Sequence, residues 1–158
     1  NDETDQRAKK DYFGGIAAKQ NIICALAQGP EDHYYMCENI ARDFYQPVMR
    51  SHRCTVEQMA ILEPALSESV GATFAKVLKE ATDEAARRGV PYQAAEDFIL
   101  GHLTILLAVA FGIQRNGKLS DGCLFAISEA EPIIFKDGWL NKIFAAGAIK
   151  ASVKSICK

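Results

Sequence analysis

The sequence predicts a mainly helical protein that begins with a single strand–helix–strand unit. From Thr55 onward, apolar residues recur every three or four positions in segments separated by glycine, proline or asparagine, which is typical of amphipathic helices. Before Thr55, two short extended segments flank one amphipathic segment, in the order of a parallel crossover. The chain of 158 residues is 49% hydrophobic, enough to form a core of single-domain size.

The first part of the chain is predicted to form one βαβ unit. Residues 21–27 (NIICALA) are a short apolar run that ends at the turn residues 28–30 (QGP), as a buried strand does. Residues 31–45 show helical spacing, and Pro47 ends that helix. Residues 48–54 are compatible with a second strand. The unit has the usual length of a βαβ crossover.

Two parallel strands are too few for a complete sheet. Parallel sheets are covered on both faces and contain more strands, because an isolated pair exposes unpaired edges. We therefore expect that another chain completes the sheet or that further strands precede it. The sequence starts at Asn1 with polar and charged residues and no signal-peptide pattern, which favours a cut within a longer chain.

The longest helix is predicted to begin at Thr55, because Thr55 and Gln58 form a capping-box pattern. An apolar stripe then continues for about eight turns. Pro64 lies inside this stripe and lacks a backbone donor, so a kink or restart is predicted near Glu63. Gly89 is expected to end the helix.

A second long helix is predicted from Pro91 to about Gly112. The stretch from Phe98 to Ile113 is apolar on nearly every side, yet shorter than the ~20 residues that cross a bilayer. It is therefore predicted to be a core helix, in the centre of a bundle or between subunits. The amount of apolar surface predicts a homodimer.

Three shorter helices are predicted after the turn at Asn116-Gly117. Ser120 caps the first of these, which is expected to end before Pro132. The second covers residues 139–144. The last carries Ile149, Val153 and Ile156 on one side and lysines on the other.

Charge and cysteine content exclude several classes of protein. Eighteen Lys and Arg against 20 Asp and Glu leave a net charge of −2, so a nucleic-acid partner is not expected. The five cysteines are odd in number, widely spread and without a C-x-x-C pair, which favours reduced thiols and a cytoplasmic location. No membrane partner is expected.

His102 is the first candidate for chemistry, because it places an imidazole inside an apolar helix beside Gly101. Such a histidine can exchange a proton with a substrate oxygen. The alternative is a core histidine that is hydrogen-bonded to a carbonyl or carboxylate group.

Glu63, Ser67 and Glu68 form a second candidate group at the predicted helix break, with Glu63 and Ser67 one turn apart. Clustered oxygens at a break can bind a polyol or act as acid and base. The alternative is that these are ordinary helix residues facing water.

Nucleotide and metal motifs are not found in the sequence. There is no G-x-G-x-x-G or G-x-x-x-x-G-K-[ST] pattern. His33, Cys37, His52 and Cys54 are residue types that bind zinc, but their spacing matches no known zinc site, so no metal is expected.

Three segments carry a resemblance to a known family: residues 55–68 (TVEQMAILEPALSE), 89–91 (GVP) and 98–102 (FILGH). They resemble the C-terminal domain of 6-phosphogluconate dehydrogenase-like NAD(P)-dependent oxidoreductases, in the branch that acts on sugar acids. Residues 11–15 (DYFGG) and 25–30 (ALAQGP) extend the resemblance over the whole chain.

The resemblance implies a domain organisation. Residues 1–54 are expected to be the tail of a nucleotide-binding Rossmann domain, which is the βαβ remnant. Residues 55–158 are expected to be the helical domain that binds substrate and dimerises. NAD or NADP would bind to Rossmann strands that precede this chain, so the chain by itself is expected to be inactive and to bind neither nucleotide.

The resemblance also implies which residues act. In the wider superfamily the long helix starts with a lysine that transfers protons and, a turn later, an asparagine. Here Ala60 takes the place of the lysine and Glu63 lies near that of the asparagine. Glu63 and His102 are therefore the expected catalytic residues, with Ser67 and Glu68 binding substrate.

The expected function is that of the substrate-side half of an NAD(P)-dependent dehydrogenase acting on the CH–OH group of a small hydroxy acid or sugar acid. The alternative is a non-catalytic helical module for dimerisation or ligand binding, which the missing lysine and the apolar stretch from Phe98 to Ile113 favour.

Overall fold

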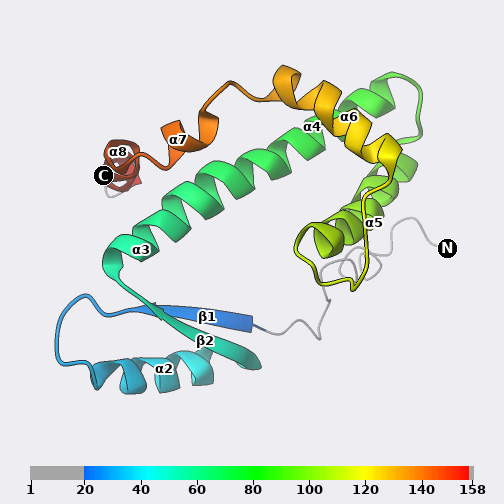
Figure 1. Cartoon of the computed structure of the whole chain (residues 1–158). Helices are drawn as coiled ribbons and strands as arrows, with labels where there is room; N and C mark the ends of the chain where they lie inside the picture. The colour runs from blue at the N-terminus through cyan, green and yellow to red at the C-terminus, as the bar shows by residue number, and fades with distance from the viewer. Residues whose placement is uncertain (1–19, 157–158) are drawn as a thin grey trace. The chain divides into compact units, whose positions relative to one another are not determined.

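A computed structural model of the chain describes residues 20–156 (Figure 1). The described part forms two compact units. The strand unit contains residues 20–71 and 146–156, and the helical unit contains residues 72–145. The mainly helical fold with one small parallel sheet confirms the predicted fold class. The segment 11–15, which contributed to the family resemblance, lies outside the described residues.

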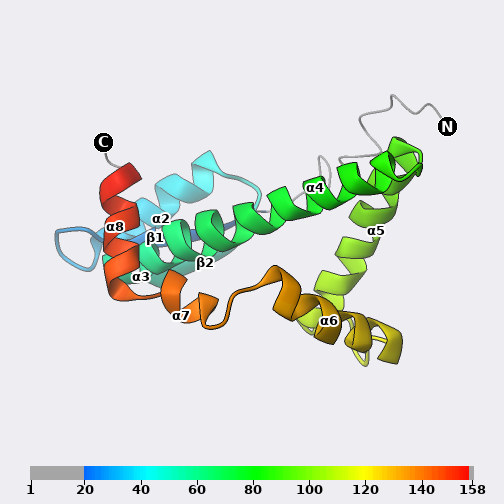
Figure 2. The same ribbon diagram turned by 90° about the horizontal axis from the view of Figure 1, so that it is seen from above.

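The strand unit starts with the predicted crossover: strand β1 (Gln20–Ala25), helix α2 (His33–Phe44) and strand β2 (Val48–Cys54). The two strands are parallel, with Ala25 opposite Cys54. Among the described residues no third strand joins them, so both outer edges are free. Helix α2 lies along one face of this pair (Figures 1 and 2).

A tyrosine on α2 ties together the ends of the two strands. The Tyr34 hydroxyl donates to the carbonyl oxygen of Cys54 at 2.8 Å and accepts the N–H of Leu26 at 3.2 Å. The second bond explains why β1 ends at Ala25, two residues earlier than predicted: the N–H of Leu26 is used by a side chain.

An arginine on β2 adds a second attachment of α2 to the sheet. The Arg53 guanidinium donates two hydrogen bonds to the Glu38 carboxylate, at 2.9 and 3.2 Å. It also lies over the rings of Tyr34 and Tyr35, 4.9 and 4.5 Å from their centres. These hydrogen bonds lower the pKa of Glu38 and raise that of Arg53.

The long helix begins as predicted. The Thr55 hydroxyl accepts the N–H of Gln58 at 3.2 Å, and the Gln58 side chain accepts the N–H of Thr55 at 2.9 Å, which is a complete capping box. Helix α3 (Val56–Ala60) is followed directly by a π-helical stretch, η2 (Ile61–Ala72), and then by α4 (Thr73–Arg87).

The predicted kink or restart near Glu63 is wrong in form, because the helix continues through Pro64 in a wider register. A proline ring collides with the carbonyl group four residues earlier in an α-helix. The i→i+5 hydrogen bonding of a π-helix moves that carbonyl group away from the ring. The helix therefore departs from the α form where the sequence predicted, around Glu63 and Pro64. It changes to π-helical hydrogen bonding there and does not break.

The end of α4 confirms the role predicted for Gly89. Its φ angle is +99°, in the left-handed region that glycine adopts without strain. Its N–H donates to the carbonyl of Ala86 at 3.0 Å, and the N–H of Val90 donates to that of Ala85 at 3.2 Å. This pair of bonds is a Schellman motif.

The helical unit continues with helices α5 (Tyr92–Ala110), α6 (Asp121–Ile134) and α7 (Trp139–Ile143). The Ser120 hydroxyl accepts the N–H of Cys123 at 3.2 Å, which confirms the predicted cap. Three aromatic rings hold the α6–α7 connection against α4: Phe74 lies 5.5 Å from Phe135 and 6.3 Å from Trp139, between ring centres.

The predicted end of α6 before Pro132 is wrong, because the helix continues to Ile134. Pro132 lies in the last turn of α6, so few hydrogen bonds of the helix are affected by its missing N–H and by its ring. The N–H groups after it still find partners: that of Phe135 donates to the carbonyl of Glu131 at 2.9 Å.

The prediction that α5 is buried is wrong for the single chain. No residue of α5 is buried, and Phe98 and the adjoining Phe111 are 66% and 76% exposed. By length and composition alone α5 could cross a membrane, which corrects the expectation that it is too short. A helix covered by another protein chain has the same length and composition.

Replacing Glu38 by glutamine tests the Arg53 attachment. Because the folded-state pKa of Glu38 lies below its ordinary value of 4.5, its stabilising effect is complete above pH 4.5 and is lost as the pH falls through the folded-state value. Glu38→Gln should therefore lower the denaturation midpoint at pH 7 and much less at pH 3.

Urea denaturation at the two pH values measures this difference. Glu80→Gln is the matched control, since it breaks the exposed Lys76–Glu80 pair within α4 and should change the midpoint little. An equal loss at both pH values for Glu38→Gln would contradict the prediction.

Candidate functional site

A cavity of about 390 Å³ lies in the strand unit, just beyond the carboxyl end of β1. Its described walls come from three places in the sequence: the end of β1 with the connection that follows it, the start of the long helix, and helix α8 (Ala146–Ile156). The lining residues are Ala25, Ala27, Val56, Met59, Ala60, Glu63, Pro64, Val153 and Ile156. Among these, Glu63 is the one ionisable residue.

The position and lining of this cavity suit a ligand. Ligands of parallel α/β sheets bind outside the carboxyl ends of the strands. Small-molecule sites are mostly apolar and contain a few polar groups that orient the ligand. Glu63 is the candidate for such a group, because it is one of the residues that line the cavity and it is exposed to solvent.

The π-helical register brings the predicted glutamate–serine group onto one face of the helix. Glu63, Ser67 and Glu68 are all exposed and all lie in η2. In a π-helix, residues four and five positions apart lie on the same side, because each turn closes at the fifth residue. The sequence spacing predicted that Glu63 and Ser67 share one face of the helix. The π-helical register places Glu68 on that same face.

His102 lies on α5, in the helical unit, and is exposed. Its Nδ1 is 2.9 Å from the carbonyl oxygen of Phe98, and its ring stacks on that of Phe98 with 4.0 Å between centres. A carbonyl oxygen only accepts, so Nδ1 carries the proton and the neutral ring has its lone pair on Nε2. The ring is thus oriented to accept a proton at Nε2.

The two predicted catalytic residues belong to different units: Glu63 to the strand unit and His102 to the helical unit. The alternative interpretation of His102 was a core histidine that is hydrogen-bonded to a carbonyl or carboxylate group. The structure shows a carbonyl partner, that of Phe98, but the His102 ring is exposed. Neither observation tests the catalytic roles, which stay predictions.

No cluster of metal ligands or activated thiol is found in the part of the chain that the structure describes. There, His, Cys, Asp and Glu side chains nowhere gather in threes. Burial, and then the charge of Glu38, raises the pKa of the Cys24 thiol, which favours the unreactive protonated form.

Sequence reasoning did not predict that helix α8 contributes to the cavity. Val153 and Ile156 line it although they lie some ninety positions after Glu63 in the sequence. The apolar side predicted for the last helix, which includes Ile149, indicated that this helix packs against another part of the protein. It carried no information about the partner surface.

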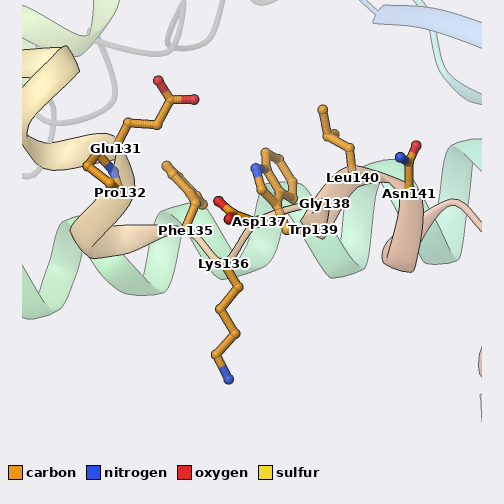
Figure 3. Close-up of a pocket in the computed structure, with 9 residues that line it drawn as sticks. All are labelled: Glu131, Pro132, Phe135, Lys136, Asp137, Gly138, Trp139, Leu140 and Asn141. Atoms are coloured by element: carbon orange, nitrogen blue, oxygen red, sulfur yellow. The ribbon is translucent and has the colours of Figure 1, made fainter.

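A second cavity, of about 480 Å³, lies at the α6–α7 connection in the helical unit. Figure 3 shows the side chains of Glu131, Phe135, Trp139 and Asn141 on one side of the chain and Lys136 pointing away. The rings of Phe135 and Trp139 stack on each other with 5.1 Å between centres. Their faces are therefore used in packing, and we place the candidate site at Glu63.

Comparison with known proteins gives one matching family model. Residues 1–157 match the model described as phosphogluconate dehydrogenase (decarboxylating) C-term. Two similar curated proteins are both named D-apionate oxidoisomerase. The one from Rhizobium rhizogenes is 52% identical over 99% of this chain and 56% of its own length; the one from Cupriavidus necator is 50% identical with the same coverage.

Two solved structures are also similar. One is a semialdehyde dehydrogenase NAD-binding protein from Cupriavidus necator in complex with calcium and NAD, with a TM-score of 0.84, 50% identity, and coverage of 99% of this chain and 56% of that one. The other is a putative oxidoreductase from Jannaschia, with a TM-score of 0.74, 44% identity, and coverage of 96% and 54%. The chain spans about half the length of the curated relatives it matches.

Proposed function

This chain belongs to the family of phosphogluconate dehydrogenase (decarboxylating) C-terminal domains, and on that premise we propose that it is the substrate-side half of an NAD(P)-dependent oxidoreductase. The substrate is a small hydroxy acid or sugar acid that is oxidised or reduced at a CH–OH group. One observation carries the proposal: Glu63 is the one ionisable residue among the described residues that line an apolar cavity beyond the carboxyl end of β1. The relatives named D-apionate oxidoisomerase support the choice of substrate class.

The residues of this chain do not fit a bound dinucleotide by themselves. The sequence contains no glycine-rich phosphate-binding turn. In the turn after β1 the side chain of His33, the first residue of α2, lies against Gly29: a Cβ atom on Gly29 would lie 2.6 Å from its Nδ1. We propose that strands joined to the β1–β2 pair, at the edges that no other described strand occupies, hold NAD or NADP, and the NAD-bound structural relative supports this.

We propose that this half of the enzyme binds the substrate and accepts the proton of its hydroxyl group. Oxidation of a CH–OH group to a carbonyl releases the hydroxyl proton, and Glu63 accepts it as general base. The hydroxyl of Ser67 and the carboxylate of Glu68, on the same face of η2, bind further substrate hydroxyls. A nicotinamide supplies the hydride chemistry in reactions of this class.

His102 is the second proposed acid–base residue. Its bond to the Phe98 carbonyl sets the tautomer, so that Nε2 can take a proton and return it. The same exposed helix supports a proposed homodimer: α5 carries Phe98, Ile105, Leu106 and Leu107 at the surface, with Phe111 just after its end. We propose that the protein works in the cytoplasm.

Glu63→Gln in the full-length protein tests the proposed function. With D-apionate and NAD as the probe, kcat should fall by about 10²–10⁴, the usual contribution of a general base. The melting temperature should stay near that of the unmodified protein, because the side chain is exposed. Glu129→Gln, an exposed acid on α6, is the control and should leave kcat unchanged.

An unchanged kcat for Glu63→Gln would show that the base is another residue. If the full-length protein oxidises no hydroxy acid or sugar acid with either nucleotide, the non-catalytic module is the better description.

His102→Ala separates proton transfer from packing. The variant should lower kcat by about 10²–10⁴ and leave thermal stability nearly unchanged, since the imidazole is exposed. Thr104→Ala is the matched control, because the Thr104 hydroxyl also donates to a carbonyl four residues earlier, at 3.2 Å. A destabilised His102→Ala variant with normal kcat would assign the ring to structure.

A charged residue on α5 tests the homodimer. Analytical ultracentrifugation at micromolar concentration should show a dimer for the unmodified protein and a monomer for Ile105→Glu, because the carboxylate would be buried at the interface without a partner. Phe44→Glu is the control: Phe44 is 82% exposed on α2, and its replacement should leave the dimer intact. A compact monomer for the unmodified protein would contradict the proposal.

A further inference from the structure

The hydroxyl group of Ser69 makes a contact that marks the π-helical register. Ser69 Oγ donates to the carbonyl oxygen of Pro64, five residues earlier, at 2.6 Å. Four other hydroxyl groups in described helices reach back only three or four residues: Thr82 to Leu78, Thr104 to Leu100, Ser128 to Phe125 and Ser155 to Ser152. Three- and four-residue contacts are those that an α-helix permits.

The widened register needs such a contact. Pro64 explains why the helix leaves the α form, since its ring excludes the carbonyl group four residues earlier. It does not explain why the wider form persists to Ala72, because π-helical stretches are rare and seldom exceed one turn. Pro64 and Ala65 are buried and Ser69 is half-buried, so the added bond lies where water competes little.

The register decides which acidic residues share a face. Five positions along an α-helix correspond to about 140° around its axis, at ~100° per residue. Glu63 and Glu68 would then point in different directions. Five positions along a π-helix return to the same side, so that Glu63, Ser67 and Glu68 form one face.

We propose that Ser69 is a positioning residue: it holds η2 in the π-helical register and thereby places Glu68 beside Glu63. This inference rests on the proposed function, in which Glu63 is the base and Glu68 binds substrate hydroxyls. Ser69 itself does not touch the substrate in this arrangement. Its effect on the reaction passes through the register of the helix.

A double-mutant cycle on the full-length protein tests the positioning role. With D-apionate and NAD as the probe, Ser69→Ala and Glu68→Gln should each lower kcat/KM by about tenfold. The double variant should be no worse than either single variant, because Glu68 is already displaced in Ser69→Ala. Ser69→Thr keeps the hydroxyl group and should restore the rate.

Ser128→Ala is the matched control for the cycle. It removes the same kind of bond, serine hydroxyl to backbone carbonyl at 2.7 Å, from the ordinary α-helix α6, and should not change kcat/KM. Losses from Ser69→Ala and Glu68→Gln that multiply in the double variant would overturn the proposal, since they would mean that the two residues act independently.

A crystal structure of the Ser69→Ala variant gives a readout that does not depend on activity. We expect i→i+4 hydrogen bonding to replace i→i+5 over much of residues 61–72. Retention of the π-helical register without the hydroxyl group would overturn the proposal. If Glu63→Gln leaves kcat unchanged, the proposed function fails separately, and the crystal structure still decides whether Ser69 holds the register.

Discussion

The ring of Pro64 is the constraint on which the arrangement of the candidate site depends. It excludes the α-helical register at one point of the long helix, and the helix responds by widening. The widened stretch begins next to the carboxyl end of β1. The change in helical register therefore affects residues that line the cavity, Glu63 and Pro64 among them. A local steric conflict thus determines which side chains share one face of the helix, at a point where Pro64 and Ala65 are buried.

Much of the fold is predictable because its signals are local. The Thr55–Gln58 capping box, the glycine stop at Gly89 and the βαβ order each depend on residues within a few positions of one another. Their geometry repeats in many proteins, so the residue types are sufficient to predict it. For the same reason the glutamate–serine group at the helix disturbance is recognisable from sequence, although its register is not.

The remaining features depend on competition or on distant partners. Whether a proline ends, kinks or widens a helix depends on where it lies, and so Pro64 in the middle of the long helix and Pro132 in the last turn of α6 have different outcomes. The contribution of Val153 to the cavity depends on packing between segments that lie far apart in the sequence. The exposure of α5 depends on what covers it, and apolar composition alone does not separate a core helix from an interface helix.

The strand unit is discontinuous in sequence: the chain leaves it at residue 71 and returns to it at residue 146. Residues are translated in sequence order. The ribosome therefore releases the elements from β1 to the start of the long helix well before helix α8. During that interval the cavity next to Met59 and Glu63 lacks the part of its lining that Val153 and Ile156 contribute. The cavity is therefore a late product of biosynthesis, assembled after the whole helical unit has been translated.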